Sequence, residues 1–213
     1  FLKQVRHFSR IIDDPEVESY IQALGYNLSS HSDNTEQPFT FFMIDNPVIN
    51  AFAGPGGMIG INSGVILNSE SESEFAGVVA HEIAHVTQRH LARTFEEAKK
   101  FSLPTAAAMI GALIIATQDP AAGQAAITGI AGFNVQNQIN FTRENEEEAD
   151  RIGISLLAKS DYDPRGMPAF FERLQKISKF SQSNAPDFFR THPLTTSRIA
   201  DSRSRAESYP EKK

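Results

Sequence analysis

The sequence predicts an α+β fold that is mostly helical, with one small sheet. β-Branched and aromatic runs gather in the first third of the chain, where turn residues separate them. From Ser71 onwards the apolar residues recur with helical spacing. A chain of 213 residues is also short enough to fold around a single core. We therefore expect one domain over residues 1–213.

The individual elements follow from local signals. Asp14 and Pro15 suit the cap and the first position of a helix. Asn46 and Pro47 form a turn that joins the first two strands. Residues 71–100 can run as one long helix. The complete expectation is strands at 38–45, 48–53 and 58–62, and helices at 14–30, 71–100, 143–159, 164–180 and 195–207.

Residues 101–142 contain a single formal charge, Asp119, and are rich in Ala, Gly, Ile and Gln. Asp119 and Pro120 divide this stretch into two apolar helices of a hairpin. Its most apolar run, 103–117, is 15 residues long, whereas about 20 are needed to span a bilayer. We expect a packed or mobile hairpin over the cleft, able to touch a membrane or a partner.

The composition excludes several classes of function. The chain has no Cys, which removes disulfide frameworks, thiolate metal sites and cysteine nucleophiles. Its net charge of -6 argues against a nucleic-acid partner.

The sequence AHEIAHVTQRH at residues 80–90 carries three of the six histidines. Residues four apart on an α-helix lie about 40° apart around its axis, so His81 and His85 project side by side. Two such imidazoles can bind Zn²⁺, and Glu82 beside them can reach a zinc-activated water. Polar residues inside an apolar helix also need partners. We therefore predict that His81 and His85 share one zinc ion.

The third histidine, His90, does not fit the same ion. The pattern HExxHxxGxxH would require Gly at 88 and His at 91, where this chain has Gln88 and Leu91. At about 100° per residue, His90 would point roughly opposite to His81 in a continuous helix. We predict that His90 is not a ligand and lies on the outer face.

A third ligand is expected from the acidic stretch RENEEEADRIG at 143–153. One helical face is small and apolar with two acids in it, which marks it as inward-facing: Glu146, Ala149, Asp150, Gly153, Leu156 and Leu157. The competing face is wholly polar and is expected to face solvent: Glu144, Glu148, Arg151 and Ser155. We predict that Glu146 binds zinc and that Asp150, one turn on, holds the second nitrogen of a ligating histidine.

Two histidines and one glutamate leave a fourth zinc position open, which is typical of catalytic rather than structural zinc sites. Zinc lowers the pKa of its water toward about 7, and Glu82 is placed to accept the proton. The predicted reaction is peptide hydrolysis. A substrate could add as an extended strand to a sheet edge formed by Asn50, Ala51 and Phe52, beside the active-site helix. The alternative is an ordinary core strand in which Phe52 only packs.

The remaining candidate is His192, in RTHPLTTSR at 190–198. Pro193 fixes the local turn before the last helix, and Arg198 follows one or two turns later as a supporting residue near the metal. Within this C-terminal loop and helix, about 188–207, three roles stay open for His192. It could close the site as a fourth zinc ligand, stabilise the oxyanion of the transition state, or lie in a surface loop.

Four segments, HEIAHVTQRHLA, NAFAGPGG, NEEEADRIGI and THPLTTSRIAD, together resemble the gluzincin metallopeptidases related to HtpX and the CAAX prenyl proteases. The resemblance covers nearly the whole chain, in the same order. It implies a zincin-like metalloprotease fold with one Zn²⁺ per chain. The residues at matching positions are the zinc ligands His81, His85 and Glu146, the catalytic Glu82 and the supporting acid Asp150.

The resemblance is strongest to soluble periplasmic members of that family. It implies an endopeptidase in outer-membrane protein quality control, which cleaves unfolded or stalled β-barrel proteins and works with their assembly machinery, with possible peripheral membrane contact. It also favours a latch role for His192, in which this residue closes the site as the fourth zinc ligand. Because the chain begins at Phe1 rather than Met, we expect a trimmed or processed product.

Two other functions compete with the endopeptidase. A chaperone-like module could bind unfolded β-barrel proteins and keep its zinc helix for structure alone, but such a scaffold needs no base at Glu82. An aminopeptidase would need an anchor for the free amine of its substrate, and the sequence offers none that we can identify.

Overall fold

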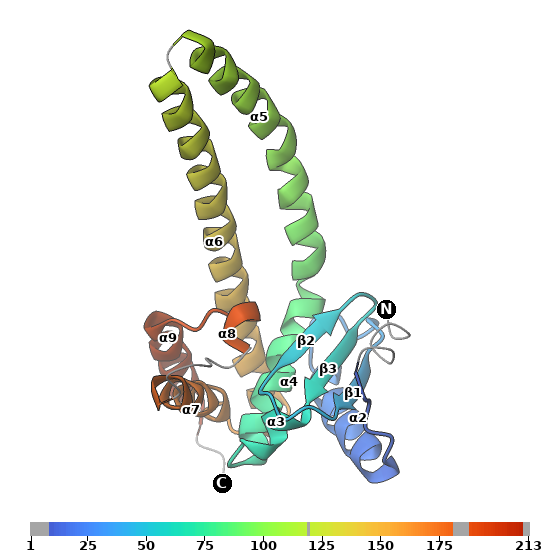
Figure 1. Ribbon diagram of the computed structural model, residues 1–213. Coiled ribbons are helices and arrows are strands. Elements are labelled where there is room, and N and C mark those ends of the chain that lie inside the picture. The colour runs from blue at the N-terminus through green and yellow to red at the C-terminus, as the bar shows by residue number, and fades with distance from the viewer. Residues whose placement is uncertain (1–8, 119, 181–187, 211–213) are drawn as a thin grey trace. The chain divides into compact units, whose positions relative to one another are not determined.

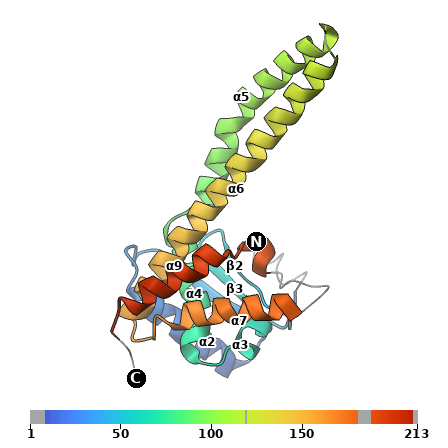
Figure 2. The same ribbon diagram turned by 90° about the vertical axis from the view of Figure 1, so that its left-hand side faces the viewer.

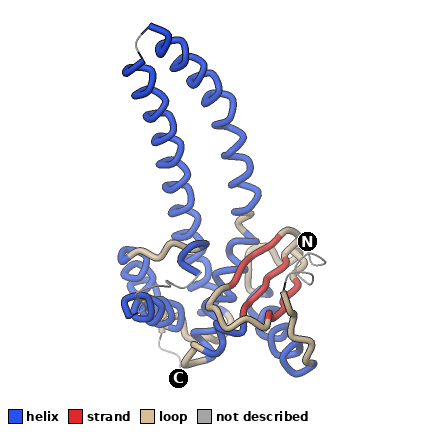
Figure 3. The backbone as a smooth tube through the Cα atoms, viewed as in Figure 1, coloured by secondary structure: helices blue, strands red, loops and turns tan. Residues whose placement is uncertain are grey.

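The computed structural model describes residues 9–118, 120–180 and 188–210. The chain divides into a first unit, Phe1–Gln88 with Glu146–Lys213, and a hairpin unit, Arg89–Asn145. The strands and most of the helices belong to the first unit (Figure 1). As predicted, the fold is α+β and mostly helical, with one small sheet (Figure 3).

The sheet consists of β1 (Thr40–Ile44), β2 (Ala51–Gly54) and β3 (Met58–Asn62), in the order β1-β3-β2. β1 is parallel to β3, and β2 is antiparallel to it. The turn expected at Asn46 and Pro47 connects β1 to β2 along the chain. The two strands are nevertheless not neighbours in the sheet, because β3 lies between them and hydrogen-bonds to both. This order leaves β2 at an edge of the sheet, as predicted. Gly56 and Gly57 make the β2–β3 turn with φ near +76° and +77°, which glycine adopts without strain.

Two helices cover the sheet. α2 (Pro15–Ser30) begins as predicted, with the Asp14 side chain accepting hydrogen bonds from the backbone N–H groups of residues 16 and 17. Its apolar face packs against β1 and α4. α4 (Glu72–Thr87) is buried along most of its length and also contacts β2, β3 and α7 (Gly166–Phe180).

The long helix expected over 71–100 is interrupted. α4 ends at Thr87, Arg89 has a positive φ of 56°, and α5 (His90–Gln118) begins at the next residue. The helical angle counted from His81 does not continue through this break. His90 is consequently not on an outer face, since it is only 3% exposed.

The hairpin unit contains α5 and the first part of α6 (Pro120–Lys159). The division between them falls where Asp119 and Pro120 predict it. α6 then continues without interruption to Lys159, so no separate helix begins at 143. Thr105 and Asn134 hydrogen-bond between the two helices, and Arg93 stacks over the Phe141 ring at 5.9 Å. Within the described residues, none of the helices combines the length and hydrophobicity that a membrane crossing requires.

The first unit is completed by α3 (Ser63–Leu67), α8 (Phe188–Thr191) and α9 (Thr196–Glu207). The Thr195 side chain caps α9 by accepting the backbone N–H of Arg198. α7 and α9 lie side by side (Figure 2). This packing brings the C-terminal segment against the helices that carry HEIAH and the acidic motif.

Candidate metal centre

Four donor side chains from three segments of the first unit converge on one point. His81 and His85 come from α4, Glu146 from α6, and His192 follows α8. Nε2 of His81 lies 3.0 Å from Nε2 of His85 and 3.2 Å from Nδ1 of His192. The Glu146 carboxylate oxygens lie 3.1 to 3.4 Å from nitrogens of all three histidines.

The sequence explains why α4 and α6 can approach so closely. A methyl group at Gly153 of α6 would lie 2.6 Å from the Met167 side chain and 3.2 Å from the backbone nitrogen of His81. Glycine therefore allows α6 to lie directly against the motif helix. Asp150 stands one turn and Glu146 two turns before Gly153 on the same buried face, which is the stripe expected from the sequence.

The donor set fits a divalent metal. Four ligands at about 2.0–2.1 Å from zinc stand about 3.3–3.4 Å apart at the corners of a tetrahedron, close to the separations found here. The buried charges point the same way. Three carboxyl groups, those of Glu82, Glu146 and Asp150, are buried with Arg198, and each of these residues is at most 3% exposed. A divalent cation would stabilise the ionised carboxylates, which are otherwise costly to bury.

Glu82 lies beside the four donors without joining them. It is fully buried, and neither carboxylate oxygen has a hydrogen-bond partner within the described part of the chain. Nε2 of His192 is 3.3 Å from Oε1 of Glu82. Burial raises the pKa of Glu82, and the charges of His192 and His81 offset this only in part. A carboxylate with a raised pKa and free oxygens is suited to accept and return a proton.

Asp150 and Arg198 form a second layer around the donors. Oδ1 of Asp150 lies 2.9 Å from Nδ1 of His81, the nitrogen that faces away from the donor cluster. Arg198 donates to both oxygens of Asp150, at 2.7 and 2.8 Å, and stacks over the Phe171 ring at 5.4 Å. A carboxylate on the outer nitrogen of a histidine fixes the ring orientation and increases its basicity as a ligand.

The pKa shifts agree with this arrangement. Burial alone would raise the pKa of Glu146, but His192 and His81 hold it well below its usual range. Burial alone would lower the pKa of His81, but hydrogen bonds to Asp150 and Glu146 raise it to about 10. Glu146 is therefore ionised, as a ligand must be, and the imidazole of His81 sits where positive charge is strongly favoured.

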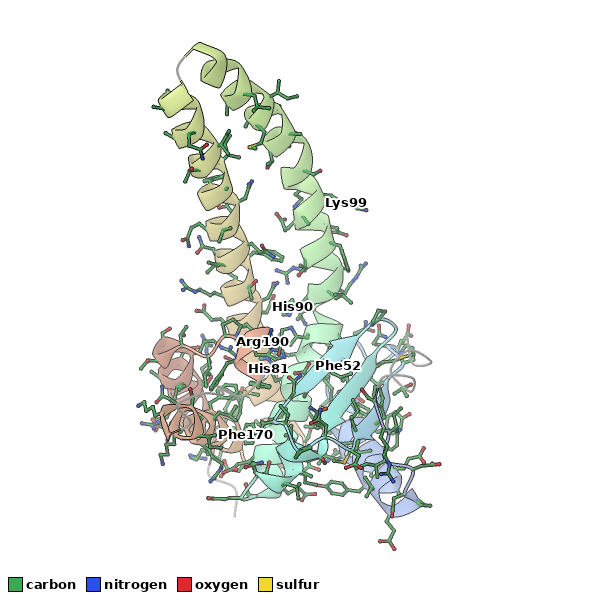
Figure 4. All side chains as sticks on the ribbon, viewed as in Figure 1. Phe52, His81, His90, Lys99, Phe170 and Arg190 are labelled. Carbon is green, nitrogen blue, oxygen red and sulfur yellow. The ribbon has the colours of Figure 1, made fainter. Side chains whose placement is uncertain are left out.

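The structure brings most of the predicted site residues together. Phe52 lies on β2, the edge strand that packs against α4, and His81 marks the site on that helix (Figure 4). Asn50 precedes β2, and its side-chain oxygen is 3.4 Å from the Thr191 hydroxyl. Ala51 is fully buried, whereas Phe52 is half-buried. His90 is not a member of the donor cluster.

Sequence reasoning missed the aromatic wall of the site. The Phe188 ring stacks on His192, with centroids 4.7 Å apart, and Phe171 meets His81 edge-on at 6.4 Å. Both phenylalanines are fully buried. Phe171 belongs to an amphipathic helix. The spacing of apolar residues in this helix predicts that Phe171 is buried, but not that it contacts His81. Phe188 is the first residue of the short helix α8, where no periodicity could identify it.

The whole chain is similar to known peptidases. The profile described as Peptidase family M48 matches residues 15–206. A putative beta-barrel assembly-enhancing protease of Vibrio cholerae is 48% identical over 210 residues, which cover 99% of this chain and 43% of the relative. The beta-barrel assembly-enhancing protease of Escherichia coli K12 is 44% identical, covering 97% of this chain and 42% of the relative. A mitochondrial metalloendopeptidase OMA1 of Danio rerio is 27% identical over 186 residues, covering 86% of this chain and 38% of the relative. The chain thus spans less than half the length of these relatives.

Proposed function

The chain belongs to peptidase family M48, a family of metallopeptidases, and on this premise we propose that it is a zinc metalloendopeptidase domain. The single observation that carries the proposal is the fully buried Glu82 carboxylate beside four converging donor atoms. His81, His85 and Glu146 would hold the zinc ion. When bound, the ion supplies Lewis acidity toward a water molecule and the peptide carbonyl.

In this mechanism the chain's own residues position groups and move protons. Glu82 takes a proton from the attacking water and passes it to the leaving amine, because its raised pKa lets it hold the proton between the two steps. Asp150 keeps the His81 ring in one orientation. The exposed edge of β2 offers backbone groups to an extended substrate, with Asn50, Ala51 and Phe52 along its path.

We assign His192 to the latch role. Its Nδ1 atom belongs to the donor cluster, and the side chain is buried rather than in an exposed loop. Four protein ligands make a closed site with low basal activity, and withdrawal of His192 would open the fourth position to substrate. The oxyanion-stabilising role is less well supported, because the ring occupies the position that the substrate would need.

The names of the relatives suggest where this peptidase acts. Two of them are named for enhancing β-barrel assembly. We propose that the substrates are unfolded or stalled outer-membrane β-barrel proteins in the periplasm, and that their assembly machinery is the partner.

A direct test compares casein cleavage and zinc content between the wild type and Glu82→Gln. The proposal requires that the substitution abolishes most cleavage and leaves zinc binding and folding intact. Cleavage within tenfold of the wild type would remove Glu82 from the mechanism. His192→Ala tests the latch separately, since opening the fourth position should increase basal cleavage or cause self-digestion.

A chaperone-like binding function is the second candidate, and one observation favours it. Large apolar side chains of the hairpin unit are between 40% and 63% exposed: Ile110, Leu113, Phe133, Val135 and Ile139. Such a surface suits unfolded clients or peripheral membrane contact. Suppression of client aggregation by Glu82→Gln, undiminished from the wild type, would separate this function from proteolysis.

A further inference from the structure

One guanidinium nitrogen connects the His192 segment, residues 188–194, to the metal centre. Nη1 of Arg198 donates to the backbone carbonyl of Pro193 at 2.8 Å. The same atom lies 2.9 Å from Oε2 of Glu146. A terminal guanidinium nitrogen carries two N–H groups, so it can serve both acceptors at once. The carbonyl next to His192 is thereby tied to the carboxylate that faces His192.

The direction of this nitrogen is itself fixed. Nε and Nη2 of Arg198 bond both oxygens of Asp150, and a two-point contact of this kind sets the plane of the guanidinium. The side chain is only 2% exposed, and one face lies over the Phe171 ring. Water therefore cannot readily replace Arg198 at the carbonyl of Pro193.

The other end of the His192 segment is anchored differently. The Phe188 ring is fully buried, and its backbone N–H donates to the carbonyl of Ile49 at 3.3 Å, just before β2. Pro193 follows His192 directly, and its ring fixes φ, so fewer rotatable bonds separate the Pro193 carbonyl from the backbone that carries the imidazole. The apolar anchor at Phe188 holds one end of the segment, and Arg198 contacts the other end.

We propose that Arg198 is a positioning residue that holds His192 in the donor set by tying the Pro193 carbonyl to Glu146 and Asp150. This inference rests on the proposed zinc site and specifies how its latch is kept closed. Release of His192 requires the Arg198–Pro193 hydrogen bond to break, while the contacts of Arg198 with the two carboxylates can persist. Arg198 therefore links the segment that closes the metal centre to two of its carboxylates.

Arginine is required for this task by its geometry. Four acceptor atoms surround Arg198: both oxygens of Asp150, one of Glu146 and the Pro193 carbonyl. The ammonium of lysine keeps the charge but has three N–H groups on one atom, and cannot span these acceptors. Arg198→Lys should keep the electrostatic balance of the buried carboxylates and lose the hold on the segment.

A double-mutant cycle on zinc affinity isolates this coupling. Zn²⁺ affinity is measured by competition with a chromophoric chelator in the wild type, Arg198→Lys, His192→Ala and the double variant. We expect Arg198→Lys to weaken zinc binding by about 10–100-fold in the wild-type background, the range typical of outer partners of a metal site. In the His192→Ala background its effect should be at least about tenfold smaller, because the segment no longer contributes a ligand.

The matched control is Arg203→Lys, on the same helix, where the arginine pairs with Glu172 at the surface. It should leave zinc affinity unchanged in both backgrounds. Hydrogen exchange provides a readout independent of the metal. Amides of residues 188–194 should exchange faster in Arg198→Lys, while those of residues 76–86 in α4 should be unchanged.

The outcomes separate this inference from the proposed function. If His192→Ala weakens zinc binding but Arg198→Lys costs the same in both backgrounds, Arg198 acts only on the carboxylates and the inference is wrong. If His192→Ala leaves zinc affinity at the wild-type value, the latch itself is wrong, and the inference with it. Should Arg198→Lys fail to fold, Thr195→Ala loosens the cap that fixes the start of α9 and enters the same cycle, with the same coupling expected.

Discussion

Charged side chains are usually exposed and large apolar side chains are usually buried. The first unit and the hairpin unit depart from this rule in opposite directions. The first unit buries several charged or titratable side chains almost completely, among them His81, Glu82, Glu146, Asp150 and Arg198. In the hairpin unit, large apolar side chains are exposed, such as Leu113 and Phe133. Buried charges and exposed apolar surface both lower stability, so each departure indicates a function. We propose that the buried charges of the first unit serve catalysis and that the exposed apolar side chains of the hairpin unit serve binding.

A single helix shows the contrast most clearly. α6 contributes Phe133 and Val135 to the exposed surface, then buries Ala149, Leu156 and Leu157 further on. Both stretches are continuous α-helix, so the backbone does not distinguish them. The difference lies in what the side chains meet, and the same kind of substitution should have unequal effects in the two stretches.

The largest effect is expected at Glu82. Glu82→Gln removes the proton acceptor while keeping its shape, so the rate of casein cleavage should fall by about 10²–10⁴-fold. Zinc content and melting temperature should stay at wild-type values. Glu72→Gln, on the exposed first turn of the same helix, is the control and should cleave normally. A fall in both variants would point to damage of α4 rather than to lost chemistry.

The next effect distinguishes the two faces of α6 at the acidic motif. Glu146→Ala should weaken zinc binding more than any other substitution there, since it removes a ligand. Asp150→Ala should cost about 10–100-fold by releasing the His81 ring. Glu144→Ala and Glu148→Ala should leave zinc affinity unchanged, because neither residue lies in the donor cluster. Equal affinities in all four variants, measured by chelator competition, would refute the assignment of faces.

Stability should respond to leucine truncation in one unit only. Leu157→Ala in the buried stretch of α6 should lower the free energy of unfolding by about 2–5 kcal/mol. Leu113→Ala, at a side chain that is 56% exposed, should change it by less than about 0.5 kcal/mol. Urea denaturation measures both. A large loss for Leu113→Ala would show that the hairpin surface is covered within the folded protein.

The smallest effect concerns dynamics. Amides of residues 101–142 should exchange with solvent at least about tenfold faster than those of residues 75–90, because exposed helices with few tertiary contacts open more easily. Mass spectrometry of the exchanging protein compares the two ranges directly. Equal protection would contradict a mobile hairpin.

Much of the metal centre was predictable because helix geometry is local. The spacing of HEIAH places His81 and His85 on one face, and the buried stripe through Gly153 selects Glu146 over Glu144. The predictions that failed depended on where a helix is interrupted and on which distant segments of the chain pair. A positive φ at Arg89 ended α4 and invalidated the angle that placed His90 outside.

Contacts between residues far apart in the sequence could not be predicted either. Nothing local indicates that β3 lies between β1 and β2, since strand order depends on which edges meet during folding. Likewise, no spacing rule links His192 to Glu146, which is 46 residues away, nor Arg198 to the Pro193 carbonyl. The chemistry of individual residues was predictable, whereas their partners required the fold.

The central claim is that the buried donors of the first unit hold one divalent metal, and metal content tests it most directly. Elemental analysis of the purified chain should find one zinc ion per chain, removable by a strong chelator, with a lower melting temperature after removal because binding stabilises the folded state. A folded chain that carries no divalent metal after incubation with Zn²⁺, and melts at the same temperature with and without chelator, would contradict the account.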